Sequence, residues 1–178
     1  MFNIIKRIIR DNYLKKKVSK INTGIIPLSK IKTAVTFIDV EDRTFDKCRQ
    51  EVLNFYREAG IKGEIFFFDF RKIDKKERLI TSPNTTILKR DLNIIGCPPE
   101  EKVNIMQSIK PDLFISLIKN ADFPIEYMAK CSEAKFKIGR KQLKGNTFDI
   151  IISDKTQGSD FSEVKIFETI KSYLYKIS

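Results

Sequence analysis

The side chains best placed for chemistry are three acids that follow the first strongly apolar run of the chain. Residues 34–40 (AVTFIDV) are β-branched or aromatic enough to indicate a buried strand, and Asp39, Glu41 and Asp42 lie at its end. Carboxylates at a strand end can act as a general base or bind a divalent cation. The plainer alternative is a solvated loop whose acids favour the N-terminus of the following helix.

Two further acids, Asp69 and Asp122, also follow apolar runs and could join the first three in space. Ligands of parallel α/β sheets bind outside the carboxyl ends of the strands, which is where all of these acids are expected. One hypothesis is therefore a pocket for a sugar phosphate or a nucleotide sugar. The residues to test first in that pocket are Asp39, Glu41, Asp42, Asp122 and Arg140.

A basic loop is expected near the end of the chain. Arg140, Lys141 and Lys144 fall between two apolar runs, residues 135–139 and 148–153. Such cations can bind phosphate as point charges. A solvated basic loop is the alternative interpretation.

Cys97 is the one cysteine whose position suggests reactivity. It lies in residues 96–99 (GCPP), directly ahead of a predicted helix, and a helix N-terminus lowers the pKa of a thiol. A small, partly buried residue beside the helix start is the alternative. Cys48 and Cys131 lie in helical stretches and are expected in the core. The odd number and wide spacing of the three cysteines favour reduced thiols.

Several kinds of chemistry are excluded by what the chain lacks. It contains no histidine, which removes Ser-His and Cys-His nucleophiles and histidine-ligated zinc. Its seven glycines form neither a G-x-G-x-x-G fingerprint nor a P-loop. The sequence therefore predicts no cofactor and no metal site, and it favours a non-catalytic protein.

The N-terminal segment is the most distinctive part of the sequence. Residues 1–21 carry seven basic side chains and one acid, so they hold +6 of the net charge of +11. Residues 2–13 have the pattern of an amphipathic helix. The stripe moves to another face from Leu14 onward, which predicts a bent helix or two short ones that end at residues 22–24. The apolar stripe consists of Phe2, Ile4, Ile5, Ile8, Ile9 and Tyr13.

This basic helix has four possible roles. The favoured interpretation is that its isoleucines pack onto the domain or onto a second copy, because an interfacial helix should keep one continuous apolar face. Contact with a protein partner or with an anionic membrane surface is left open. Nucleic acid is less favoured, because the chain lacks tryptophan and a stacking pattern. The candidate contact residues are Lys6, Arg7, Arg10, Lys15, Lys16 and Lys17.

The elements that must position these residues alternate between strand and helix. This alternation predicts a Rossmann-like, three-layer α/β/α fold with a largely parallel sheet of about five to six strands, plus the N-terminal helix. We expect residues 1–28 to form the helix and a linker, and residues 29–178 to form one α/β domain. Strands are expected at residues 34–40, 64–70, 85–89, 112–118, 135–139 and 148–153, helices at 45–59, 100–109, 124–133 and 161–177, and a loop or hairpin at 71–84.

No apolar run approaches the roughly 20 residues that a membrane span needs. Lys6, Arg7 and Arg10 interrupt what would be the apolar region of a secretory signal. The sequence therefore predicts a cytoplasmic protein, with peripheral attachment to the inner membrane as an option.

Residues 111–140 carry a family resemblance. An aspartate precedes an apolar run, a helix follows, and Ala-Lys-x-x-Ile-Gly closes the segment. Together with residues 91–96 (DLNIIG) and the chain length, this pattern resembles an uncharacterised domain-of-unknown-function family from Bacteroidota, over most of residues 30–178. The same 30 residues also look like the N-terminal half of heptosyltransferase-type glycosyltransferases, whose second half this chain is too short to contain. The first resemblance implies no activity, and the second implies shared architecture.

The leading functional hypothesis from the sequence is a non-catalytic binding or interaction module that uses residues 1–21. The alternative is a small enzyme or binder of a sugar phosphate or nucleotide sugar at the strand ends. RNA binding is the third hypothesis.

Overall fold

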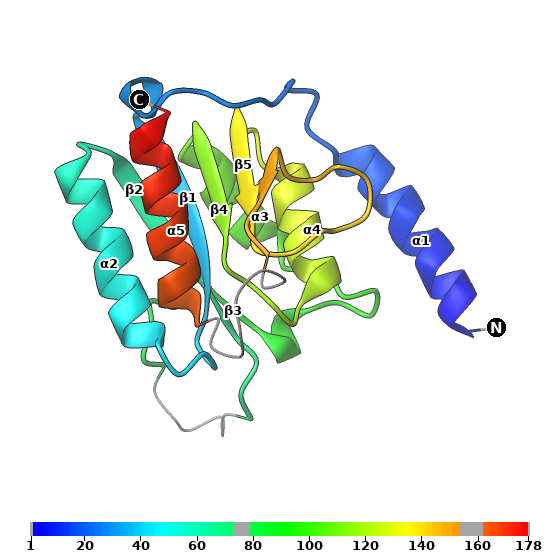
Figure 1. Cartoon of the computed structure of the whole chain (residues 1–178). Coiled ribbons are helices and arrows are strands. Elements are labelled where there is room, and N and C mark those ends of the chain that lie inside the picture. Colours follow the sequence, from blue (N-terminus) through cyan, green and yellow to red (C-terminus); the bar gives the residue numbers. More distant parts are fainter. Residues whose placement is uncertain (1, 73–78, 154–161, 178) are drawn as a thin grey trace.

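The computed structural model describes residues 2–72, 79–153 and 162–177 (Figure 1). Six strands form one sheet: β1 (Thr33–Asp39), β2 (Lys62–Asp69), β3 (Thr86–Leu88), β4 (Leu113–Ser116), β5 (Phe136–Gly139) and β6 (Ile150–Ile151). The α-helices are α1 (Phe2–Lys17), α2 (Phe45–Glu58), α3 (Glu100–Ser108), α4 (Asp122–Cys131) and α5 (Glu163–Lys176). Short 3₁₀ helices cover Leu28–Lys30 and Lys89–Asp91.

Every pairing in the sheet is parallel, and the strand order is β3-β2-β1-β4-β5-β6. Parallel strands need a crossover connection, and α2, α3 and α4 provide it between β1 and β2, between β3 and β4, and between β4 and β5. Helices α2 and α5 cover one face, and α3 and α4 cover the other (Figure 1). The predicted Rossmann-like three-layer fold is confirmed.

Strand β1 shows how the sequence builds two cores. Side chains alternate across a strand, so Ala34 and Ile38 face α2 and α5, whereas Val35 and Phe37 face α3 and α4. All four are fully buried. The nearly unbroken apolar run of β1 is therefore what a strand covered on both faces requires.

Some element boundaries differ from the prediction. Helix α1 is one continuous helix that ends at Lys17, whereas the sequence predicted a bend near Leu14 and an end at residues 22–24. The last strand is shorter than predicted, because only Ile150 and Ile151 pair with β5. Phe161, the first residue of the predicted terminal helix, and residues 73–78 of the predicted loop or hairpin lie outside the described residues.

Helix α1 ends early because the backbone that follows it hydrogen-bonds to the carbonyl end of α4. The last carbonyls of a helix lack partners within the helix and need donors from elsewhere. The backbone N–H of Ser19 donates to the carbonyl of Lys130 at 2.9 Å, and the amide of Gln107 donates to the carbonyl of Cys131 at 3.0 Å. The chain therefore leaves its helical path directly after α1.

Lys137 supplies the remaining donors from the sheet below. Its side chain is buried, and Nζ donates to the carbonyls of Ala129 at 2.6 Å and Ser132 at 2.9 Å. Burial lowers the pKa of this lysine to about 8. A lysine in the middle of β5 thus closes the end of α4.

We expect this buried lysine to make stability depend on alkaline pH. The amine has a pKa near 10.5 when exposed and about 8 in the fold, so the unfolded chain binds more protons between these values. Wild-type stability should therefore rise, relative to Lys137→Met, as the pH increases from 8 to 10. Urea unfolding of both proteins at each pH measures this difference. A difference that stays constant across the range would show that the lysine does not titrate with folding.

Candidate functional site

The strand order places a topological switch between β1 and β4. From β1 the chain proceeds outward through β2 and β3, whereas from β4 it proceeds in the opposite direction through β5 and β6. The carboxyl ends of β1 and β4, at Asp39 and Ser116, therefore form the crevice where ligands of open α/β sheets bind. Four candidate residues from the sequence, Asp39, Glu41, Asp42 and Arg140, lie at this edge.

Asp42 joins three segments at the switch. Its Oδ1 accepts hydrogen bonds from the backbone N–H and the hydroxyl of Thr44, at 2.8 and 2.6 Å. Its Oδ2 accepts from the backbone N–H of Glu163 at 3.3 Å and lies 4.0 Å from Nη1 of Arg140. The carboxylate thus links the loop after β1, the start of α5 and the residue after β5.

Arg140 is buried among the strand ends and crosses them. Its Nη1 donates to the carbonyl of Leu117 at 3.3 Å, so the guanidinium bridges the ends of β4 and β5. A charge in such a position needs polar partners, and the carboxylate of Asp42 and this carbonyl are two of them.

Glu163 is the central residue of the site that the sequence analysis missed. Its side chain is fully buried, and Oε1 accepts from the backbone N–H of Asp39 at 2.6 Å. Its Oε2 has no hydrogen-bond partner within the described residues. Burial raises the pKa of this carboxyl well above its usual value, so the fold favours its neutral form. The sequence offered one signal, an acid in the first turn of a helix, and that pattern normally means an exposed residue.

Asp39 and Glu41, the other acids of the loop, are hydrogen-bonded to each other within the loop after β1. Burial raises the pKa of Asp39, and its Oδ1 accepts from the backbone N–H of Glu41 at 2.9 Å. The Glu41 side chain is exposed. Within the described residues, no group of three acids or thiols is arranged to hold a metal ion. The described contacts at this edge thus tie the loop after β1 to the start of α5.

Asp122, Lys141 and Lys144 lie away from this network. Nζ of Lys141 contacts both carboxylate oxygens of Asp122 at 2.8 and 2.9 Å in an exposed ion pair. Asp122 and Lys144 line a cavity of about 420 Å³ between α1 and α4, together with Lys6, Arg7 and Arg10 of α1. The predicted ligand residues are therefore divided between the strand ends and the α1–α4 cavity.

Cys97 is buried, and burial raises the pKa of its thiol. Its backbone N–H donates to Oδ1 of Asn93 at 2.9 Å, within the turn that precedes α3. The raised pKa favours the unreactive thiol form, and the reactivity of Cys97 stays a prediction. All three cysteines are buried free thiols.

Helix α1 docks on α4 through one side. Leu14 is buried, and the ring of Tyr13 stacks on that of Tyr127 at 6.0 Å. Arg10 lies over the ring of Phe123 at 4.2 Å and donates from Nε to the carbonyl of Ile95 at 2.6 Å. Lys17 pairs with Glu100 of α3 at 2.8 Å. Two of the six candidate contact cations, Arg10 and Lys17, are therefore bonded to the domain.

Gly96 makes room for this docking. Its φ is +92°, and a Cβ atom placed on it would lie 2.9 Å from Nη2 of Arg10. Only glycine combines that backbone conformation with so close an approach of the guanidinium.

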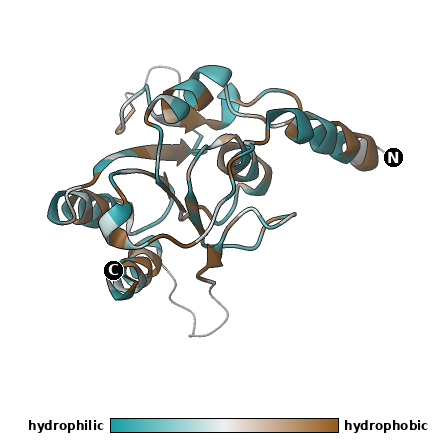
Figure 2. Ribbon diagram, turned by 90° about the horizontal axis from the view of Figure 1, so that it is seen from above, coloured by the Kyte–Doolittle hydropathy of each residue, from teal (hydrophilic) through white to brown (hydrophobic). Residues whose placement is uncertain are grey.

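The opposite side of α1 is apolar and open. Ile4, Ile5, Ile8 and Ile9 are between 46% and 66% exposed. At about 100° per residue they span an arc of about 140°, centred opposite Arg10 and Leu14. Figure 2 shows the N-terminal end of α1 standing away from the body of the molecule, with hydrophobic residues on it. The isoleucines therefore do not pack on their own domain, contrary to one part of the favoured interpretation.

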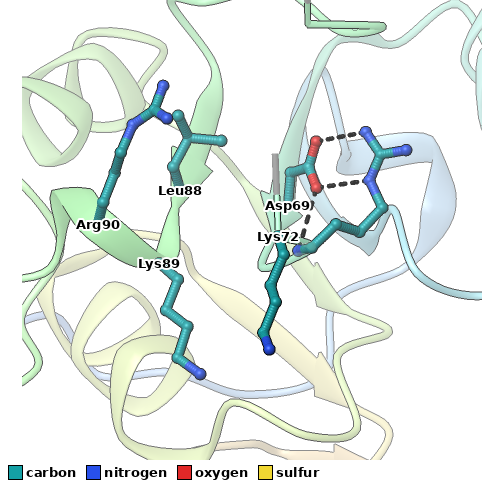
Figure 3. A pocket seen from close by; sticks show the side chains of 6 residues that line it. Asp69, Lys72, Leu88, Lys89 and Arg90 are labelled. Carbon is teal, nitrogen blue, oxygen red and sulfur yellow. Dashed lines mark hydrogen bonds and ion pairs between the residues drawn. The ribbon is translucent and has the colours of Figure 1, made fainter. Parts of the chain in front are cut away.

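Four cations that the sequence analysis did not single out line a pocket at the ends of β2 and β3 (Figure 3). They lie directly after the strands, where a charged loop looks like an ordinary solvated turn. Only the parallel pairing of β2 with β3 brings them together. These residues are Arg71, Lys72, Lys89 and Arg90.

We expect Glu163→Gln to change the dependence of stability on pH. The glutamate keeps its proton in the fold at pH values where the unfolded chain has lost it, so wild-type stability should fall as pH rises above about 4.5. Glutamine does not titrate, so the stability of the variant relative to the wild type should increase progressively as the pH rises above about 4.5. Urea unfolding measures this, with the exposed Glu168→Gln on the same helix as control. Parallel pH profiles for all three proteins would contradict the assignment.

None of the described helices has the length and apolarity that a bilayer crossing needs.

No curated protein matches the chain. A protein-family model does match, over residues 3–177, and this region begins inside α1 and ends after α5. Because the match covers nearly the whole sequence, the region that the family model spans includes α1 together with the sheet, and the chain is a member of DUF6913, a family of unknown function.

Proposed function

We propose that this protein is a non-catalytic module that attaches peripherally to an anionic membrane surface, on the cytoplasmic side, through α1. The observation that carries the proposal is the orientation of the helix. Arg10, Tyr13 and Leu14 hold α1 against α4, and the four isoleucines face away from the domain.

The exposed isoleucines supply an apolar contribution to binding. Full burial of an apolar side chain of this size contributes about 1.5 to 3 kcal/mol. Each isoleucine is roughly half exposed, so completing the burial of all four contributes on the order of 4 kcal/mol. A helix that lies in the bilayer interface buries its apolar face at the boundary between headgroups and acyl chains.

The basic residues of α1 supply an electrostatic contribution. Lys15 and Lys16 are exposed and follow the isoleucines along the same side of the helix. A basic residue near an anionic leaflet contributes about 1 kcal/mol. Neither contribution gives firm attachment alone, but together they meet the usual requirement for two membrane signals.

The break in the apolar stripe at Leu14 agrees with this arrangement. An interfacial helix should keep one continuous apolar face, and Leu14 lies off that face. Leu14 is buried against the domain, so it belongs to the docking side of α1 and not to the outward side. The outward side keeps a continuous apolar surface from Ile4 to Ile9.

Charge favours a membrane over a second copy of the chain. Residues 1–21 carry a net charge of +6, so pairing of two α1 helices would place two strongly basic segments together. An anionic bilayer offers the opposite charge along the whole helix. RNA also offers it, but phosphates would leave the isoleucines in water.

The double variant Ile5→Glu/Ile8→Glu should lose membrane binding. Two carboxylates on the outward side remove apolar contact and repel anionic lipid, so the partition coefficient should fall by at least about tenfold. Co-sedimentation of the full chain with phosphatidylcholine vesicles that contain phosphatidylserine measures the effect. The matched control is Ile94→Glu, which introduces a carboxylate at a position that is 93% exposed and outside α1.

Three results would overturn the proposal. The first is a wild-type protein that does not bind these vesicles, and the second is equal binding by the double variant and the control. The third is a wild-type dimer that the double variant dissociates, without vesicle binding, because that result would assign the isoleucines to a second copy.

A second prediction separates the two contributions. Lys15→Glu/Lys16→Glu should weaken binding to vesicles that contain phosphatidylserine and leave binding to pure phosphatidylcholine nearly unchanged. Wild-type binding should also fall as the salt concentration rises, because salt screens these exposed charges. A salt-independent wild type would contradict an electrostatic role for the helix.

A further inference from the structure

We propose that the ends of β2 and β3 form a binding site for a phosphate-bearing small molecule, in which Lys72 and Lys89 contact the phosphate. This site is separate from the outward face of α1 and does not depend on its proposed role. It uses the carboxyl edge of the sheet, where the fold places ligands, but not the residues that the sequence suggested for that edge.

The pocket exists because two parallel strands end side by side. Asp69 of β2 pairs with Leu88 of β3, so the residues after both strands leave the sheet at the same edge. The cavity between them has a volume of about 290 Å³, which suits a small ligand. Each strand contributes two cations to its lining: Arg71 and Lys72 after β2, Lys89 and Arg90 after β3.

Asp69, the one acid among the described residues of the lining, is already neutralised. The Asp69 side chain is fully buried, and both of its oxygens accept from the guanidinium of Arg71 at 2.8 Å. Such a two-pronged pair fixes both groups and leaves the carboxylate little capacity for a further cation. Figure 3 shows the dashed contacts of Asp69 on one side of the pocket, with the Lys72 and Lys89 side chains extending beside it in the same direction.

The remaining cations gather without a compensating acid. Across the part of the chain that the structure describes, no carboxylate pairs with Lys72, Lys89 or Arg90. The described residues of the lining comprise four basic groups and one acid, so their net charge is +3. Like charges that share one pocket repel each other, and a phosphate dianion removes that repulsion.

The turn that carries Lys89 is closed before any ligand binds. Oδ2 of Asp91 accepts from the backbone N–H of Leu88 at 3.0 Å, which closes the 3₁₀ turn at Lys89–Asp91. On the other strand, the backbone N–H of Arg71, the residue before Lys72, donates to Oδ1 of Asp69 at 3.4 Å. A ligand therefore meets Lys89 on a closed turn, which reduces the entropy lost on binding.

The test uses inorganic pyrophosphate and ribose 5-phosphate as probes in isothermal titration calorimetry with the full chain. We expect saturable binding of at least one probe to the wild type. The double variant Lys72→Glu/Lys89→Glu should weaken binding at least about tenfold, because two charge-assisted contacts become repulsive. Lys72→Gln/Lys89→Gln should weaken it less. Circular dichroism checks that each variant folds.

The matched control is Lys32→Glu/Lys62→Glu, which makes the same charge change at exposed positions beside the amino ends of β1 and β2. Its affinity for the probes should stay close to that of the wild type. Equal losses of affinity in both double variants would show that the effect depends on overall charge alone, and this result would overturn the site. Failure of the wild type to bind either probe saturably would also overturn it.

Vesicle co-sedimentation distinguishes a free phosphate compound from a lipid headgroup. We expect the Lys72→Glu/Lys89→Glu variant to bind anionic vesicles as the wild type does, because α1 is intact. Loss of vesicle binding in this variant, together with no response to the soluble probes, would assign the lysines to the membrane surface and overturn the small-molecule site.

Discussion

The carbonyl end of α4 is the constraint on which the arrangement of the molecule depends. A helix that ends in the interior leaves carbonyl groups that must find donors, since an unpaired polar group costs about 1 to 3 kcal/mol there. Ser19, Gln107 and Lys137 provide these donors from three different segments. Because one of the donors is the backbone just after α1, satisfying α4 also fixes the direction of α1. The outward position of the isoleucines follows from this attachment together with the contacts of Arg10, Tyr13 and Leu14 on the inner side.

The carboxyl edge of the sheet is used unevenly. At the switch between β1 and β4, where many proteins of this strand order hold a nucleotide on a glycine-rich turn, Asp42 and Glu163 tie the loop after β1 to the start of α5. A buried carboxyl with a raised pKa there suits a structural contact better than recognition of an anion. The neighbouring ends of β2 and β3 are instead lined by cations. This positive charge therefore lies one strand away from the switch point, where proteins of this strand order bind a nucleotide.

The parts of the fold that depend on local pattern could be predicted from the sequence. The run at residues 34–40 is a buried strand because its β-branched and aromatic side chains suit both covered faces, and the same argument located the other central strands. The short strand β6 was overestimated, since an apolar run shows where a strand can form but not how many of its residues find a partner. Glu163, Lys72 and Lys89 were missed for a related reason. The pattern around each fits a solvated surface residue. Packing buries Glu163, and strand order places Lys72 and Lys89 beside one pocket.

The two edges of the sheet limit how this molecule can meet others. The outermost strands, β3 and β6, contain three and two residues. A foreign strand added at either side would gain only a few ladder hydrogen bonds, so extension of the sheet from chain to chain is disfavoured. Natural proteins often guard such borders with charge or proline, whereas here the brevity of the border strands gives the same protection. Association through the backbone is thereby discouraged, and recognition is left to side chains.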